Sequence, residues 1–136
     1  MSLSTGQTQH IATKLAKEIL RKPIAEQAVV VALQGDLGSG KTTFVQGLAK
    51  GLGIKENITS PTFTIIKRYD NFYHIDCYRL DKSEEILELG LKEIISNPKN
   101  IIAIEWPERI KKFLPKNTIY YKFKFADKSK REIKNI

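Results

Sequence analysis

The sequence predicts an α/β protein built as a three-layer sandwich, with parallel strands at the centre of a mixed sheet and an antiparallel hairpin at one edge. Two apolar runs, residues 28–33 and 101–104, are typical of strands buried on both faces. Segments with helical periodicity alternate with these runs, which places helices on both sides of the sheet. At 136 residues the chain has the length of one domain, predicted over residues 1–136.

Helices are predicted where apolar residues recur at spacings of three and four. Residues 8–20 follow this rule, and apolar residues supply a helix face between Ser83 and Pro98. Helices are also predicted over residues 41–50, after the glycine-rich turn, and over residues 107–113. The helix over residues 8–20 ends before Pro23, and the helix over residues 41–50 ends at Gly51 or Gly53. Ser83 is the expected N-cap of the helix that Pro98 ends.

Strands are predicted over residues 28–33, 63–69, 73–78, 101–104 and 118–125. The pair Asp70-Asn71 separates two of them and is expected to form the turn of the edge hairpin. The last six residues are expected to add an edge strand. Together these elements give the mixed sheet.

Composition excludes several classes of protein. Hydrophobic residues make up 41% and charged residues 28% of the chain, as in an ordinary soluble domain. The apolar runs are far shorter than the roughly 18 residues that a membrane span needs, and the N-terminus lacks a signal-peptide core. We therefore expect a cytoplasmic protein without a membrane partner. Cys77 is the one cysteine, so it is expected to fill space in a strand rather than to form a disulfide or a zinc site.

A glycine-rich loop carries the chemistry. Gly35, four residues and then Gly40-Lys41-Thr42 have the Walker A spacing, and they lie between a buried strand and a helix. The loop predicts a P-loop NTPase-like fold whose backbone N–H groups bind phosphates. Lys41 is expected to reach the β- and γ-phosphates, and the Thr42 hydroxyl to ligate Mg²⁺. Neither side chain is expected to pack in the core. The predicted nucleotide-binding residues are Asp36, Leu37, Gly38, Ser39, Gly40, Lys41, Thr42 and Thr43.

Two acidic residues are candidates for the carboxylate that a P-loop enzyme needs beside the phosphates. Glu105 directly follows the buried run 101–104, and Asp76 lies within the predicted strand 73–78. A carboxylate at either place is costly to bury without a partner. For Asp76 the alternative is a structural salt bridge to Arg79 or Arg68, and the sequence leaves open which acid is the main one.

Positive charge is concentrated near the C-terminus. Residues 1–110 carry 14 Lys or Arg against 13 Asp or Glu, whereas residues 111–136 carry 9 against 2. Such a segment can attract RNA or an acidic partner, or it can simply be a solvated face.

Four segments together resemble a known family. They are Gly-Asp-Leu-Gly-Ser-Gly-Lys-Thr-Thr (35–43), Thr-Ser-Pro-Thr-Phe-Thr (59–64), His-Ile-Asp-Cys-Tyr-Arg-Leu (74–80) and Ile-Glu-Trp-Pro-Glu-Arg (104–109). In order and spacing they resemble the TsaE family, the ATPase component of bacterial tRNA threonylcarbamoyladenosine (t6A) biosynthesis. The resemblance extends from about residue 8 to residue 125. Ser39 stands where alanine is usual, and Ile11-Ala12 where Leu-Gly is usual.

The resemblance implies a P-loop ATPase that uses ATP and Mg²⁺ and works with TsaB and TsaD on the adenosine beside the anticodon. It implies catalytic roles for Lys41, Thr62, Asp76, Glu105 and Trp106, and a magnesium site that includes Thr42 and Glu105. Thr62 would sense the γ-phosphate, and Trp106 would be an aromatic residue beside the site. Contact with tRNA is expected through the complex, aided by the basic C-terminal segment.

Two other functions share parts of this pattern. A small nucleoside or nucleotide kinase would have the same loop, but it should also have an arginine-bearing lid, and residues 81–100 contain no arginine. A nucleotide-gated RNA-binding module without catalysis would account for the basic segment. In the predicted ATPase, no arginine lies in a predicted loop that clearly faces the γ-phosphate, and Arg79 is the nearest candidate. Because such an arginine speeds hydrolysis, we expect weak turnover by the isolated protein and activation by its partners.

Overall fold

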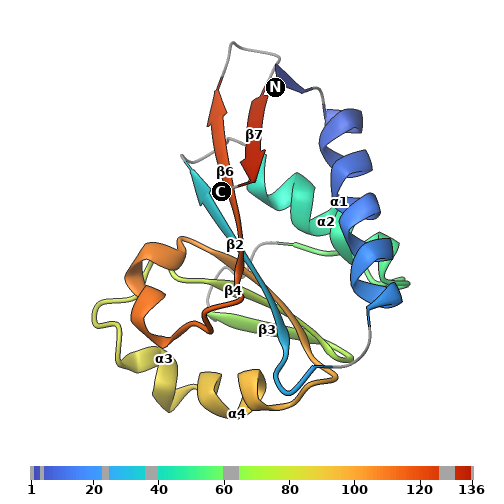
Figure 1. Ribbon diagram of the computed structural model, residues 1–136. Helices are drawn as coiled ribbons and strands as arrows, with labels where there is room; N and C mark the ends of the chain where they lie inside the picture. The colour runs from blue at the N-terminus through green and yellow to red at the C-terminus, as the bar shows by residue number, and fades with distance from the viewer. Residues whose placement is uncertain are drawn as a thin grey trace.

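In the computed structural model, one mixed sheet links segments from both ends of the chain (Figure 1). The structure describes residues 2–3, 5–22, 25–35, 40–59, 65–125 and 131–135. Within these residues the strands are arranged in the order β1-β7-β6-β2-β5-β4-β3. Their bounds are β1 (Ser2–Leu3), β2 (Val29–Gly35), β3 (Ile66–Tyr69), β4 (Phe72–Asp76), β5 (Ile101–Glu105), β6 (Ile119–Phe125) and β7 (Arg131–Asn135).

The centre of the sheet is parallel, as predicted. β2 pairs in parallel with both β5 and β6, and β4 pairs in parallel with β5. β3 and β4 form the antiparallel edge hairpin. Asp70 in its turn has a φ of 58°, a left-handed conformation that aspartate tolerates better than most residues. The predicted fold class is therefore confirmed.

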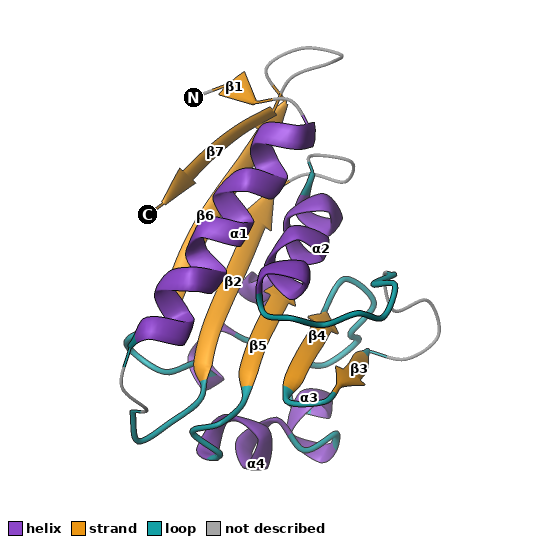
Figure 2. Ribbon diagram, turned by 90° about the vertical axis from the view of Figure 1, so that its right-hand side faces the viewer, coloured by secondary structure: helices purple, strands orange, loops and turns teal. Residues whose placement is uncertain are grey.

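Helices cover both faces of this sheet. α1 (Thr5–Arg21) and α2 (Lys41–Gly51) pack together on one face, and α3 (Glu85–Glu88) and α4 (Leu91–Ser96) lie on the other (Figure 2). Each face has its own apolar cluster, one including Leu33 and Phe44 and the other including Ile102 and Ile86. β2 and β5 contribute to both clusters, which explains why their sequences are continuously apolar.

Some predicted elements differ from the structure. The helix expected between Ser83 and Pro98 is two short helices, because Gly90 between them has a φ of 97° and cannot continue a right-handed helix. Ser83 is not its N-cap, since Glu84 holds that position without a side-chain hydrogen bond. The segment 107–113 forms two 3-10 helices, η1 (Pro107–Arg109) and η2 (Lys111–Phe113), on either side of the buried Ile110.

The strands also show two differences at the edges of the sheet. The strand predicted over residues 63–69 is described from Ile66, and positions 63–64 lie outside the described residues. The expected C-terminal strand is present as β7, which pairs with β6. It is not the edge, however, because the two-residue β1 pairs with its other side. The two-residue strand β1 was not predicted.

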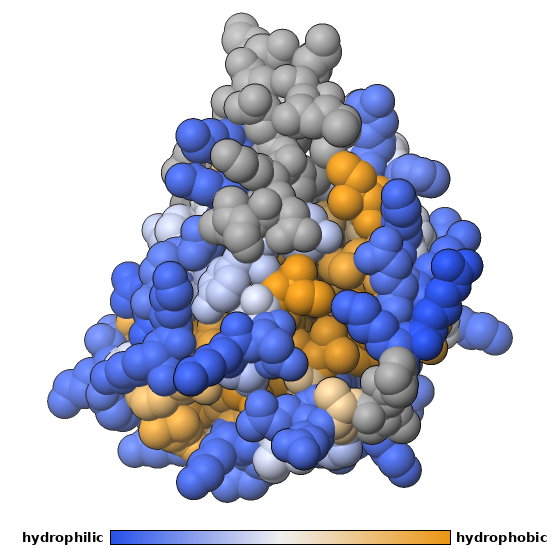
Figure 3. Space-filling view, viewed as in Figure 1, coloured by the Kyte–Doolittle hydropathy of each residue, from blue (hydrophilic) through white to orange (hydrophobic). Residues whose placement is uncertain are grey.

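One face of the molecule is mainly polar. Hydrophilic residues cover much of the face seen in Figure 3, with hydrophobic residues in smaller areas between them. Within the described residues, no helix combines the length and apolar character that a membrane span requires.

Candidate functional site

The site begins where three parallel strands end. β2, β5 and β4 run in the same direction, so their carboxyl ends meet at one edge of the sheet. In the register, Glu105 pairs with Leu33 of β2 on one side and with Asp76 of β4 on the other. The two predicted carboxylates, Asp76 and Glu105, are therefore neighbours on adjacent strands. They lie level with Leu33, which is two residues before the end of β2. Ligands of open α/β sheets bind at this end of the strands.

Gly35 ends β2 in a place that only glycine fits. Its φ is 145°, and a Cβ added there would lie 2.8 Å from the Cβ of Phe123 and closer still to the Phe123 carbonyl oxygen. The neighbouring strand β6 therefore packs directly on the glycine backbone. Residues 36–39 lie outside the described residues, which include Gly40 and the helix that follows it. The predicted strand before the loop and the predicted helix after it are both confirmed.

Lys41 is the first residue of α2, and its side chain turns back toward the sheet. Its Nζ donates a hydrogen bond of 2.7 Å to the Gly35 carbonyl oxygen. The same nitrogen lies 3.8 Å from the centroid of the Trp106 ring, within cation–π range. Lys41 is only 3% exposed, so the expectation that it would not pack in the core is wrong. Thr42 and Thr43 follow in the first turn and are partly buried.

Trp106 lies directly after β5 in a left-handed conformation, with a φ of 58°. A bulky residue rarely adopts this conformation, and such outliers cluster at functional sites. The turn directs the indole between two partners, the Lys41 ammonium and the Tyr78 ring at 5.0 Å. The structure thus brings Trp106 and Lys41 together, although 65 positions separate them in the sequence.

Glu105 has a partner that the sequence analysis did not single out. The Nε2 of His74 lies 2.6 Å from the Glu105 Oε2, and the two residues are 0% and 5% exposed. Because a carboxylate only accepts hydrogen bonds, Nε2 carries the hydrogen and donates it. His74 belongs to the segment 74–80, one of the four that carry the family resemblance. It precedes Asp76 by two residues in β4, and alternate residues of a strand share a face, so the two side chains lie on the same face. This alternation was the sequence signal that could have identified His74 as a site residue.

Asp76 is partly buried beside this pair. Burial raises the pKa of its carboxyl above the ordinary value, and the charge of Glu105 raises it further. The backbone N–H of Tyr78, which donates to Asp76 Oδ1 at 3.0 Å, acts in the opposite direction, as do His74 and Lys41. Arg68, one of the two predicted salt-bridge partners, instead donates to the Asp70 carbonyl oxygen and lies over the Tyr73 ring.

These residues fit a phosphate and a magnesium ion by the chemistry of their donors. A buried ammonium and two carboxylates lie at the carboxyl ends of β2, β5 and β4, and Thr42 follows Lys41 in the first turn of α2. Mg²⁺ prefers hard oxygen ligands such as carboxylates and hydroxyls. Among the described residues, no three His, Cys, Asp or Glu side chains are grouped closely enough to hold a metal. A magnesium site here would thus combine Thr42 and Glu105 with phosphate oxygens. Asp36, Leu37, Gly38, Ser39 and Thr62 lie outside the described residues.

Cys77 follows Asp76 but belongs to the opposite face of the sheet. It is fully buried in the cluster that includes Ile102 and Ile86, and burial raises the pKa of its thiol to about 12. A thiol with such a pKa is unreactive at neutral pH. Cys77 is thus a buried packing residue, as predicted, but it lies one position beyond the end of β4 and not within a strand.

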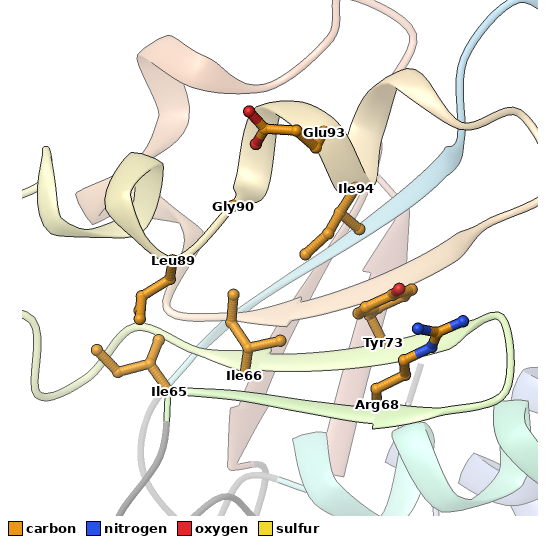
Figure 4. Close-up of a pocket in the computed structure, with 8 residues that line it drawn as sticks. All are labelled: Ile65, Ile66, Arg68, Tyr73, Leu89, Gly90, Glu93 and Ile94. Atoms are coloured by element: carbon orange, nitrogen blue, oxygen red, sulfur yellow. The ribbon is translucent and has the colours of Figure 1, made fainter.

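A separate groove lies on the face of the sheet that carries α4, opposite to the face that α1 and α2 cover. It has a volume of about 780 Å³. Apolar side chains form most of its wall, with Glu93 on the α4 side and Arg68 on the β3 side (Figure 4). Within the described residues, none of the predicted site residues lines it.

Comparison with known proteins gives one consistent result. The family model described as "Threonylcarbamoyl adenosine biosynthesis protein TsaE" matches residues 3–133. Proteins named tRNA threonylcarbamoyladenosine biosynthesis protein TsaE are similar over most of their length. The one from Treponema pallidum is 42% identical over 81% of this chain and 83% of its own. The one from Bacillus subtilis is 41% identical over 84% of this chain and 73% of its own.

A solved structure agrees with these sequence relatives. The crystal structure of YdiB from Bacillus subtilis superposes with a TM-score of 0.73 at 34% sequence identity. The match covers 99% of this chain and 83% of that one. The similarity therefore includes the whole sheet and both helical layers.

Proposed function

The chain belongs to the TsaE family, and we propose that it is the ATP-binding and ATP-hydrolysing component of the t6A modification machinery. In this proposal it acts with TsaB and TsaD on the adenosine next to the anticodon of tRNA. The relatives' names support the pathway, and the residues at the strand edge support the chemistry.

One observation carries the chemical part of the proposal. The Lys41 ammonium is buried at the carboxyl end of β2, between the Gly35 carbonyl and the Trp106 ring. Burying a cation in this way does not by itself stabilise a fold. A cation held at the start of a helix, where backbone N–H groups also point outward, suits a polyphosphate ligand. This supports nucleotide binding at this edge.

Each residue of the site has a role in the proposed hydrolysis. Lys41 binds phosphate oxygens and offsets the charge that develops on them. Thr42 and Glu105 are the residues that would hold Mg²⁺, which when bound neutralises phosphate charge and orients the oxygens. Asp76 is the second acid, and its raised pKa suits a group that takes a proton from water. Thr62 is proposed as the γ-phosphate sensor, and Trp106 holds the Lys41 side chain in place.

Partners complete the proposed cycle. No arginine is assigned to the γ-phosphate, and an arginine supplied by a partner raises turnover by roughly 10³- to 10⁵-fold in other P-loop enzymes. We therefore expect weak turnover by the isolated protein. TsaB and TsaD would activate it by supplying a contact or by ordering the segment that contains Thr62.

A direct test measures ATP turnover by the protein alone and then with TsaB and TsaD. The proposal predicts low activity alone and a large increase with both partners. Glu105→Gln should bind ATP and the partner complex but should not turn over. Equal rates with and without the partners would contradict the activation. Phosphate appearing on a nucleoside would indicate a small P-loop kinase instead.

A further inference from the structure

We propose that His74 is a positioning residue that fixes the orientation of the Glu105 carboxylate at the carboxyl end of β5. This inference rests on the proposed function, since it assigns His74 a role at the same site. It begins from the 2.6 Å contact between His74 Nε2 and Glu105 Oε2.

The register of β4 and β5 explains how the two side chains meet. His74 is paired with Ala103, and Asp76 with Glu105. Residues at alternate positions share a face, so His74, Ala103 and Glu105 all point to the side that α2 covers. Because the methyl group of Ala103 is small, the imidazole can extend diagonally past it to the carboxylate.

The remaining neighbours of Glu105 make this hydrogen bond decisive for its orientation. On the β2 side its register partner is Leu33, which is fully buried and apolar. On the β4 side its partner is Asp76, another carboxylate, which repels it. Among the described residues, His74 provides the side-chain hydrogen bond found for Glu105. Without this donor, the buried carboxylate would turn away from its acidic neighbour.

The other imidazole nitrogen shows that His74 is poorly suited to a purely structural role. Its Nδ1 is buried and has no hydrogen-bond partner in the described part of the chain. A buried nitrogen without a partner destabilises the fold, and an apolar residue of similar size would avoid that cost. The histidine therefore costs stability and provides one donor, which is directed at Glu105.

The two oxygens of the Glu105 carboxylate have different roles in this geometry. Oε2 is engaged by His74, so Oε1 is the oxygen that His74 leaves for the ligand. Groups that orient a ligating or reacting carboxylate in this way typically change affinity or activity by 10- to 100-fold when removed. We expect an effect of that size on turnover, with little change in ATP binding by Lys41.

Two substitutions separate the hydrogen bond from packing. His74→Leu fills the space but removes the donor, whereas His74→Gln keeps an N–H donor at a position similar to Nε2. Both variants, together with Glu105→Asp and His74→Leu/Glu105→Asp, are assayed with TsaB and TsaD for kcat and KM. ATP affinity is measured by calorimetry, and the fold of each variant is checked by circular dichroism.

The expected result is a loss in kcat of roughly 10- to 100-fold for His74→Leu with KM and ATP affinity within about threefold of the native values. His74→Gln should restore most of the loss. In the Glu105→Asp variant the shorter side chain withdraws the carboxylate from the imidazole. Adding His74→Leu to this variant should lower kcat by less than about twofold, because both changes break the same contact. Native kcat in His74→Leu, equal losses in the Leu and Gln variants, or full additivity would overturn the proposal.

Crystal structures of the native protein and the two His74 variants give a readout that does not depend on activity. Glu105 should keep its orientation in His74→Gln and change it in His74→Leu. An unchanged Glu105 in His74→Leu would refute the positioning role even if ATP hydrolysis were confirmed. Conversely, a native protein that never turns over ATP would refute the proposed function, and the Glu105 orientation would still decide the role of His74.

Discussion

Replacing Lys41 with methionine should weaken ATP binding while leaving the stability of the protein nearly unchanged. Methionine keeps most of the length of the lysine stem and fills the same buried space next to Trp106. What is lost is the ammonium, with its hydrogen bond to Gly35 and its contact with the Trp106 ring. This one substitution therefore separates the contribution of Lys41 to the stability of the protein from its contribution to ATP binding.

The magnitude follows from the contacts of Lys41. The hydrogen bond to Gly35, in which the donor is charged, contributes about 1.5–3 kcal/mol, and the contact with Trp106 about 0.5–2 kcal/mol. Against these stands the cost of desolvating a buried ammonium, which amounts to several kcal/mol. The two sides nearly cancel, so we expect the free energy of unfolding to change by less than about 2 kcal/mol. Losing one charged hydrogen bond to phosphate should weaken ATP binding by about 10- to 100-fold.

Urea denaturation measures the first quantity and calorimetric titration with ATP and Mg²⁺ the second. Lys50→Met is the matched control, since Lys50 is exposed at the other end of the same helix and should change neither value. Native ATP affinity in Lys41→Met would refute the assignment of Lys41 to the phosphates. A loss of stability above about 4 kcal/mol would show instead that the ammonium is mainly structural.

Three further predictions concern other parts of the structure. Gly35→Ala should destabilise the fold by about 2–4 kcal/mol in urea denaturation, because the added Cβ meets the Phe123 backbone at an unfavourable φ, while Gly6→Ala, with open space around it, should not. Asp76→Asn should raise stability at pH 7. The raised pKa of Asp76 means that native stability falls as pH rises through that pKa, so the difference should vanish below about pH 3.8, and a constant difference would contradict it. Lys122→Gln/Lys124→Gln should reduce the salt dependence of binding to a TsaB–TsaD–tRNA complex, and an unchanged slope would show that these exposed β6 lysines are only solvated.

The sequence predicted the centre of the fold better than its edges, for a physical reason. β2 and β5 are buried on both faces, so nearly every residue in them is apolar and their signal is continuous. The edge strand β1 has two residues and makes its pairs with β7, which lies at the other end of the sequence. No local pattern of two residues can indicate such a pairing. Gly90 shows the same limit, since a glycine adopts left-handed and right-handed φ about equally well and its φ of 97° is not fixed by its residue type.

The site was predictable where residues are neighbours in the sequence and not where the sheet brings them together. The spacing of Gly35, Gly40 and Lys41 is local, and it correctly indicated the strand and helix on both sides of the loop. The contact between His74 and Glu105 joins residues 31 positions apart and depends on the register of β4 and β5. The burial of Lys41 likewise depends on the turn at Trp106. Neither the His74–Glu105 contact nor the burial of Lys41 has a local pattern in the sequence.

The concentration of buried ionisable groups at one edge is best explained by a ligand. Lys41, His74 and Glu105 are each at most 5% exposed, and Asp76 lies beside them with its pKa raised by burial. Apolar residues at these positions would give a core at least as stable, since buried charges rarely repay their desolvation. The other buried side chains of β2, β4 and β5 follow the ordinary rule of apolar burial. Departures from that rule are expected where a protein keeps polar groups for binding or chemistry. The carboxyl ends of β2, β5 and β4 are therefore where the proposed nucleotide would be bound.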